Sequence, residues 1–172
     1  MAEIIIEPNF QSNSNININS NINSNSNSNS NSLNNIHDDK SIEDLIDLTL
    51  LTKFEFDIAV LFYKVCKNEY KTTSKQSKSG ATITTWYILK NEKWEKESKE
   101  KILEKIKNVL NNLYENKIEQ INLELNTITN DNIYYKIINN KKLTAKKILN
   151  KIQKKNFIKN IIRESNELFH SE

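Results

Sequence analysis

Two stretches decide the fold of this chain: FEFDIAVLFYKVCKNEY (residues 54–70) and TITTWYILKNEKWEKE (residues 82–97). We expect a lysine-rich loop over residues 71–79 to connect them. Apolar residues in the first stretch recur at the spacing of one helical face. They are Phe54, Ile58, Leu61, Phe62, Val65 and Cys66. Thr52 and Glu55 would form a capping box at the start of that helix. The pattern therefore predicts an amphipathic helix with one buried face.

The second stretch is typical of a β-hairpin because β-branched and aromatic residues surround a short polar turn. One strand face would carry Ile83, Thr85, Tyr87 and Leu89, and the other Thr84, Trp86 and Ile88. Residues 91–93 would form the turn, and Trp94 would begin the return strand opposite the Trp86–Tyr87 pair, where aromatic contacts stabilise a small sheet. We therefore expect one aromatic hairpin near residues 82–96.

Helical spacing continues through the rest of the chain. One long apolar stripe comprises Ile102, Leu103, Ile106, Val109, Leu110, Leu113, Ile118, Ile121 and Leu125. Its partner would be either the other apolar helices or a second copy of the protein. Thr144 would cap a further helix with an apolar face at residues 145–152. Residues 41–172 are thus expected to form a mainly α (α+β) domain with the hairpin between its second and third helices.

Four segments resemble a known family when they are taken in order. They read DIAVLFYKVCKNEYK (57–71), WYILKNEKWEKE (86–97), KEKILEKIKNVL (99–110) and NFIKNIIRESNELFHSE (156–172). They are similar to the region preceding the superfamily 3 helicase domain in primase-helicases of poxvirus-type, nucleocytoplasmic large DNA viruses, which phage and plasmid primases also carry. The resemblance covers about residues 57–172. It implies a linker or collar between a primase and an ATP-dependent helicase ring, here as a truncated or split-gene fragment.

The single glycine, Gly80, limits which nucleotide-binding and catalytic motifs the sequence can contain. A P-loop needs at least two glycines and a dinucleotide fingerprint three, and a nucleophile elbow needs two. We therefore expect no ATP site, no catalytic residue and no cofactor in this chain. The only histidines, His37 and His170, lack cysteine partners at metal-ligand spacing, so we expect no metal site. The lone Cys66 is expected to be a buried small hydrophobe.

Acidic residues cluster after the tail, at Asp38, Asp39, Glu43 and Asp44. They could serve as metal ligands, but Ser41 begins an SxxD pattern that favours a role in the first turn of a helix.

The first 40 residues form a low-complexity tail, in which every odd position from Asn13 to Asn31 is asparagine. Alternation with serine and isoleucine offers no apolar face, so we expect disorder. The tract resembles a codon repeat from an A+T-rich genome. Such a genome also inflates lysine, so lysine content alone is weak evidence for nucleic-acid binding.

Charge distribution along the chain is more informative than charge content. Residues 38–57 hold seven acids and two lysines, whereas residues 132–163 hold nine lysines, one arginine and no acid. We expect candidate DNA contacts at Lys146, Lys147, Lys151, Lys154, Lys155 and Lys159. The alternative interpretation is an ordinary solvated lysine face.

Trp86, Tyr87 and Trp94 are expected to form the structural centre of the aromatic hairpin. Because Lys90, Lys93 and Lys96 lie between and beside them, base stacking with single-stranded nucleic acid is the alternative.

Taken together, these patterns predict a non-catalytic DNA-replication module whose partners are DNA, a helicase subunit or another copy of itself. The alternative is a helical interaction or oligomerisation domain with no nucleic-acid role. No segment approaches the roughly 18 apolar residues of a membrane span, and the opening MAEIIIEPNF is too short and acidic for a signal peptide. We therefore expect an intracellular protein without a membrane partner.

Overall fold

The computed structural model of the chain describes residues 40–130 and 132–171, in which helices and a three-stranded antiparallel sheet form a mainly α fold. The helices are α2 (Ile42–Thr52), α3 (Glu55–Cys66), α4 (Lys99–Leu125), α5 (Ile133–Ile152) and α6 (Lys155–Leu168). The strands are β1 (Tyr70–Gln76), β2 (Thr82–Lys90) and β3 (Lys93–Glu97). The expected fold class is confirmed. The disorder expected for the tail concerns residues that lie outside the described ranges, apart from Lys40.

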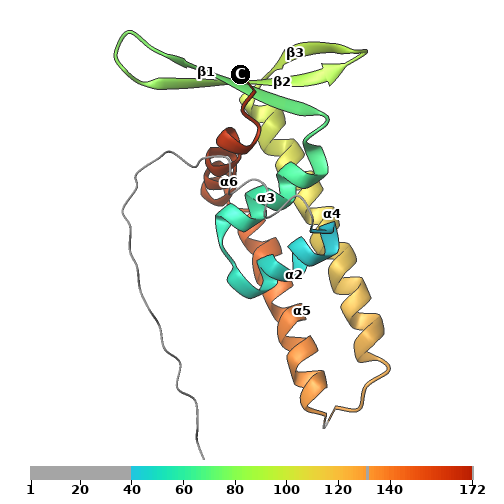
Figure 1. Cartoon of the computed structure of the whole chain (residues 1–172). Helices are drawn as coiled ribbons and strands as arrows, with labels where there is room; N and C mark the ends of the chain where they lie inside the picture. Colours follow the sequence, from blue (N-terminus) through green and yellow to red (C-terminus); the bar gives the residue numbers. More distant parts are fainter. Residues whose placement is uncertain (1–39, 131, 172) are drawn as a thin grey trace, which may run out of the picture.

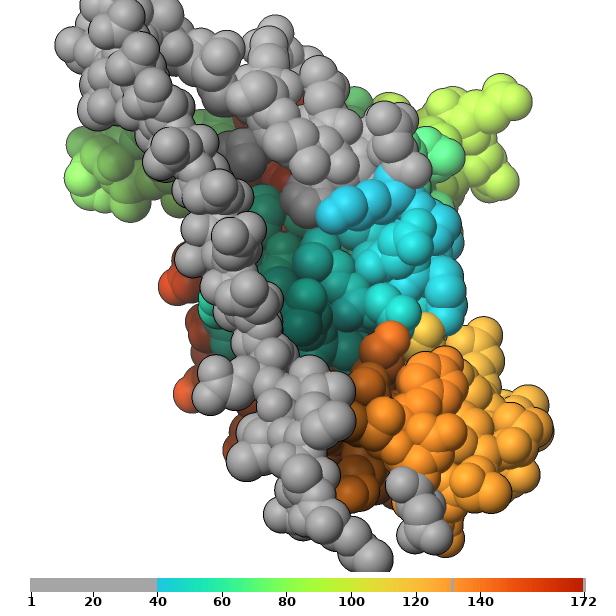
Figure 2. Space-filling model, turned by 60° about the horizontal axis from the view of Figure 1, so that its bottom comes forward, coloured from blue at the N-terminus to red at the C-terminus, as the bar shows by residue number. Residues whose placement is uncertain are grey.

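The sheet caps one end of the helical bundle (Figure 1). α4 leads away from the sheet, α5 returns beside it, and α6 completes the return beside α3. α2 lies across the middle of the α4–α5 pair, so the far end of that pair stands beyond it (Figures 1 and 2). The two ends of the sheet project past the helices on opposite sides in both views.

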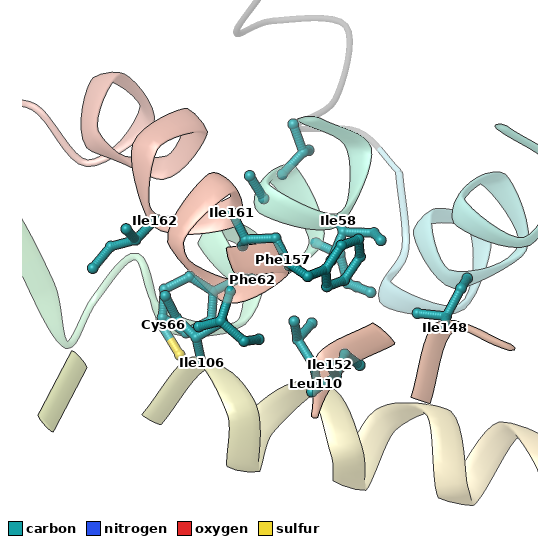
Figure 3. Close-up of a cluster of buried hydrophobic side chains, with 14 of the residues drawn as sticks. Ile58, Phe62, Cys66, Ile106, Leu110, Ile148, Ile152, Phe157, Ile161 and Ile162 are labelled. Atoms are coloured by element: carbon teal, nitrogen blue, oxygen red, sulfur yellow. The ribbon is translucent and has the colours of Figure 1, made fainter. Parts of the chain in front are cut away.

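The main apolar core joins the helices at the level of α3 (Figure 3), and a smaller second cluster of Ile121, Leu125 and Ile138 lies between α4 and α5. The labelled side chains of the main core are Ile58, Phe62, Cys66, Ile106, Leu110, Ile148, Ile152, Phe157, Ile161 and Ile162. These positions come from the apolar faces of α3, α4, α5 and α6, as helical periodicity predicts. Burial of Cys66 is confirmed, and desolvation raises the pKa of its thiol to about 12.

The start of α2 follows its sequence signal. Ser41 and Asp44 form a capping box, in which the Ser41 hydroxyl accepts the Asp44 N–H at 3.1 Å and the Asp44 carboxylate accepts the Ser41 N–H at 3.2 Å. The predicted box between Thr52 and Glu55 is wrong. The Thr52 hydroxyl instead donates to the Asp57 carboxylate at 2.6 Å, because α2 still includes Thr52.

The start of α5 was also predicted wrongly. The helix begins at Ile133, and the Asn132 side chain caps it by accepting the Tyr134 N–H at 2.8 Å. Thr144 lies inside the helix, where its hydroxyl donates to the Asn140 carbonyl at 3.0 Å.

The sheet contains one strand more than expected. Residues 71–76 of the predicted loop belong to β1, which pairs with β2 from Tyr70 opposite Ile88 to Gln76 opposite Thr82. The predicted hairpin of β2 and β3 is present, but Trp94 lies opposite Leu89 and not opposite the Trp86–Tyr87 pair. The reason is the turn, which has only two residues outside the strands, both with positive φ.

Trp86 fastens the sheet to the helices. Its side chain is buried, its indole N–H donates to the Asn166 side-chain oxygen at 3.0 Å, and its ring centroid lies 5.0 Å from that of Phe169. The backbone N–H of Thr72 donates to the Phe169 carbonyl at 2.8 Å. The end of α6 is thereby held against the inner face of the sheet.

Two consecutive hydrogen bonds between buried groups, which we call the hydroxyl relay, link α4 to α2. The fully buried Tyr114 donates its O–H to the Thr49 hydroxyl at 2.7 Å, and Thr49 donates to the Ile46 carbonyl at 2.6 Å. Desolvation raises the pKa of the Tyr114 phenol well above its ordinary value.

We predict that Tyr114→Phe lowers the free energy of unfolding by about 1–2 kcal/mol, because the Thr49 hydroxyl loses its donor inside the core. Chemical denaturation measures the change. The control is Tyr63→Phe on α3, whose partly exposed ring contacts Phe169; it should change stability by less than about 0.5 kcal/mol. Equal effects of both substitutions would contradict a special role for the relay.

Candidate nucleic-acid interface

The six candidate lysines lie around the turn between α5 and α6, and all are exposed. We call them the lysine surface: Lys146, Lys147 and Lys151 on α5, Lys154 in the turn, and Lys155 and Lys159 on α6. The sequence pattern predicts that Lys147, Lys151, Lys154 and Lys155 form one stripe along a single helix, and this prediction is wrong. α5 ends at Ile152, so Lys154 lies in the turn and Lys155 and Lys159 lie on a second helix that runs in a new direction.

Buried apolar residues on both sides of the turn fix its geometry. Ile148 and Ile152 anchor the end of α5, while Phe157 and Ile158 anchor the start of α6. The Lys154 N–H donates to the Lys151 carbonyl at 2.8 Å. With the apolar residues directed into the core, the lysines between them face solvent.

An open depression of about 470 Å³ lies at the turn and is lined by Lys151, Lys154, Lys155 and Phe157, among others. The Lys151 ammonium sits 5.7 Å from the centroid of the Phe157 ring, within the range of a cation–π contact. Glu55 at the start of α3 supplies a carboxylate to its wall. The depression can therefore hold an anionic group beside three ammonium groups.

None of the six lysines forms an ion pair within residues 40–130 and 132–171. Two acids of α2, Glu43 and Asp47, instead pair with two lysines outside this set. Lys117 pairs with Glu43 and lies 2.8 Å from an Asp47 carboxylate oxygen, and Lys141 lies 3.2 Å from the other oxygen. Among the described residues, the lysine surface therefore has no ion-paired carboxylate, and Glu55 is the one acid that lines its depression.

The α2 ion pairs shift the pKa values of both partners. Desolvation opposes ionisation of Asp47, but Lys117 and Lys141 outweigh it and lower the pKa of this carboxyl below 3.8. Desolvation likewise opposes the charge on Lys117, but Asp47 and Glu43 outweigh it and raise the pKa of this ammonium above 10.5.

Arg163 is a residue that the sequence-based choice of sites missed. It follows Lys155 and Lys159 at i+4 steps on α6 and is exposed, so it extends their row toward the sheet. Its guanidinium lies 3.0 Å from Glu164, which compensates part of its charge. The i+4 spacing was the signal that could have identified it.

The aromatic residues of the hairpin do not form one cluster. Core packing is confirmed for Trp86, which is buried, whereas Tyr87 is half-buried and the Trp94 side chain is 40% exposed. The Lys71 ammonium lies over the Trp94 ring at 4.5 Å from its centroid. Trp86 and Trp94 therefore have separate roles on opposite faces of the sheet.

Within the described part of the chain, no three His, Cys, Asp or Glu side chains converge as metal ligands would. The same residues include no helix with the length and apolar content needed to cross a bilayer. No protein-family model matches the sequence, and a search of curated proteins finds no match.

We predict a coupling energy of about 1 kcal/mol between Asp47 and Lys117 at pH 7, modest because the carboxylate remains partly solvated. A cycle of Asp47→Asn, Lys117→Met and the double variant measures it by denaturation. Because the folded-state pKa of Asp47 is lowered, its contribution is present above pH 3.8 and is lost as pH falls through the lower folded value.

The exposed pair of Lys90 and Glu95, 3.7 Å apart, serves as the control and should show almost no coupling. A coupling energy between Asp47 and Lys117 that persists in acid would contradict the assignment to this ion pair.

Proposed function

We propose that this chain is a non-catalytic DNA-binding module that contacts the phosphate backbone through the lysine surface. The observation that supports this most directly is that six exposed lysines lie in the turn between α5 and α6 and on the helix segments that flank it, with no ion-pair partner among the described residues. Apolar anchors on both sides hold the turn in place. The fold therefore sets the positions of these lysines without a bound ligand.

Backbone contact is the recognition mode that fits such a surface. Lysines neutralise phosphates and release condensed counterions, which gives affinity without sequence information. The formal net charge of the whole chain is only +3, so a uniform field would attract DNA weakly. The local concentration of lysines produces a positive potential that the small net charge of the whole chain does not.

The assignment to DNA replication rests on the resemblance of residues 57–172 to the region ahead of the helicase in viral primase-helicases. In this proposal residues 1–172 contact DNA for a helicase whose ATP site lies outside them, because a single glycine cannot build a P-loop. We also propose an intracellular location, with which the buried, unpaired Cys66 is compatible.

We predict that the chain binds duplex DNA with a steep salt dependence, measured by fluorescence anisotropy at several salt concentrations. Replacing Lys147, Lys151 and Lys154 together by glutamine should reduce the slope of log K against log salt by about 2–3, if each contacts one phosphate. Affinity should fall similarly for unrelated sequences, because phosphate contacts carry no base preference.

The matched control replaces Lys99, Lys107 and Lys136 by glutamine, which removes the same charge from α4 and the far end of α5. This variant should keep most of the slope. Equal losses in the two triple variants would show that only net charge matters, and the lysine surface would then have no special role.

A second candidate function, self-association, is supported by apolar side chains at the free end of the α4–α5 pair. Leu123, Ile133 and Ile137 are 64%, 75% and 52% exposed there. Exposed apolar residues gathered at one end are typical of a contact surface. A defined oligomer in analytical ultracentrifugation, with no DNA binding by the wild-type chain, would favour this candidate over the first.

A further inference from the structure

The outer face of the three-stranded sheet combines aromatic, apolar and basic side chains. Strand alternation sends Tyr70, Thr72 and Trp86 inward, where all three are buried. The outer face consists of Lys71, Thr73 and Lys75 on β1, Ile83, Thr85, Tyr87 and Leu89 on β2, and Trp94 and Lys96 on β3. It is directed away from the helical bundle (Figure 1).

Charge is divided between the two faces of the sheet. None of the nine outer residues is acidic, whereas Glu95 and Glu97 belong to the opposite face. There Lys90 lies 3.7 and 3.9 Å from the two carboxylates, and Lys101 lies 3.5 Å from Glu97. In contrast, Lys71, Lys75 and Lys96 have no acidic partner in the described ranges. The charged residues of the outer face are therefore all basic.

The aromatic side chains of this face are accessible and lie next to its lysines. Tyr87 pairs with Lys71 on one side and with Lys96 on the other, and Trp94 neighbours it diagonally through Leu89. Leu89 and Trp94 are each 40% exposed, and Ile83 is 57% exposed. Lysines therefore border the apolar area, with Lys71 and Lys96 on the two sides of Tyr87 and Lys75 opposite Ile83.

We propose that this outer sheet face is a binding site for single-stranded nucleic acid. Bases would stack on Trp94 and Tyr87, with the Lys71 ammonium moving from the Trp94 ring to a phosphate. The other phosphates would contact Lys75 and Lys96. An open antiparallel sheet with accessible aromatic residues and adjacent cations is the arrangement that binds unpaired bases, because every base has a face to stack and a phosphate to neutralise.

Charge complementarity distinguishes this occupant from a second copy of the chain. Two such faces stacked on each other would bring like charges together, since each carries three lysines and no acid. A polyanion removes that repulsion. A duplex also fits less well, because its bases are already stacked and cannot cover the Trp94 ring.

The site goes beyond the proposed function because it uses different residues at the other end of α6. The lysine surface surrounds the start of that helix, whereas Phe169, just after its end, touches the sheet. Either surface can bind while the other does not, so their failures can be told apart.

The first test titrates the full chain with an oligothymidine of about 20 nucleotides at low salt. Trp94 is exposed and Trp86 is buried, so stacking should quench mainly the fluorescence of Trp94. In Trp94→Phe the quench should disappear while most of the binding, followed by anisotropy, remains. A quench that survives in Trp94→Phe would place the bound strand elsewhere and overturn the proposal.

The second test compares affinities. The double variant Tyr87→Ala/Trp94→Ala should bind the oligothymidine roughly 10-fold or more weakly, yet bind duplex DNA as wild type does. Lys96→Gln should weaken single-strand binding, whereas Lys93→Gln on the other face of β3 should not. Thermal unfolding of each variant identifies any loss of binding that comes from misfolding. The Trp94→Phe variant, which should retain binding, serves as the folded reference.

Three outcomes would overturn the proposal. The first is the absence of single-strand binding by the wild-type chain at low salt, and the second is equal binding by the double alanine variant in its folded state. The third is an oligomer that dissociates on Trp94→Ala, which would make the face an interface between copies. The triple glutamine variant of the lysine surface should keep the Trp94 quench, so failure of the proposed function leaves this test valid.

Discussion

The aromatic contact between α6 and the sheet is the interaction on which the rest of this structure depends. Phe169 lies 5.0 Å from Trp86, 5.5 Å from Phe62 and 5.0 Å from Tyr63 between ring centroids, so it touches both β2 and α3. Hydrogen bonds from the Trp86 indole to Asn166 and from the Thr72 N–H to the Phe169 carbonyl hold the same end of α6 against the sheet. A three-stranded sheet needs packing on one face to be stable, and this contact leaves the other face free.

The helices could be predicted from sequence because their signal is repeated many times. In α3 and α4 the apolar residues recur over several turns, and a single wrong cap does not change the pattern. The position where a helix begins depends on one or two capping side chains, so the sequence predicts it less well. Asn132 and Thr144 are both capable caps, and no neighbouring residue distinguishes the earlier one, which begins α5.

β1 was missed because its residues are polar. Strand prediction relies on β-branched and aromatic residues, whereas this strand reads YKTTSKQ and takes its stability from pairing with β2. The register of Trp94 was missed because Asn91 and Glu92 adopt positive φ without a glycine. Because of these two errors, the composition of the outer sheet face could not be predicted: neither Lys71 nor Trp94 was assigned to it.

The lysines of the candidate site illustrate what sequence can and cannot supply. Codon bias toward A and T raises the number of lysines, but it does not determine which of them lie next to a carboxylate in the folded chain. Lys117 and Lys141 meet the acids of α2, whereas the lysine surface meets none among the described residues. The same sorting occurs on the sheet, where strand parity separates Glu95 and Glu97 from the outer lysines. Composition alone does not produce such separation in space.

α6 gives the two basic surfaces a fixed relation. The helix is anchored by Phe157 and Ile161 near its start and by Phe169 after its end, so it cannot swing without breaking the core. Its 14 residues span about 21 Å. A strand stacked as in a duplex, at about 3.4 Å per nucleotide, needs about six nucleotides to cover that length alone. A shorter stacked strand reaches only one surface, so joint occupation requires a longer strand, a more extended one or two separate molecules.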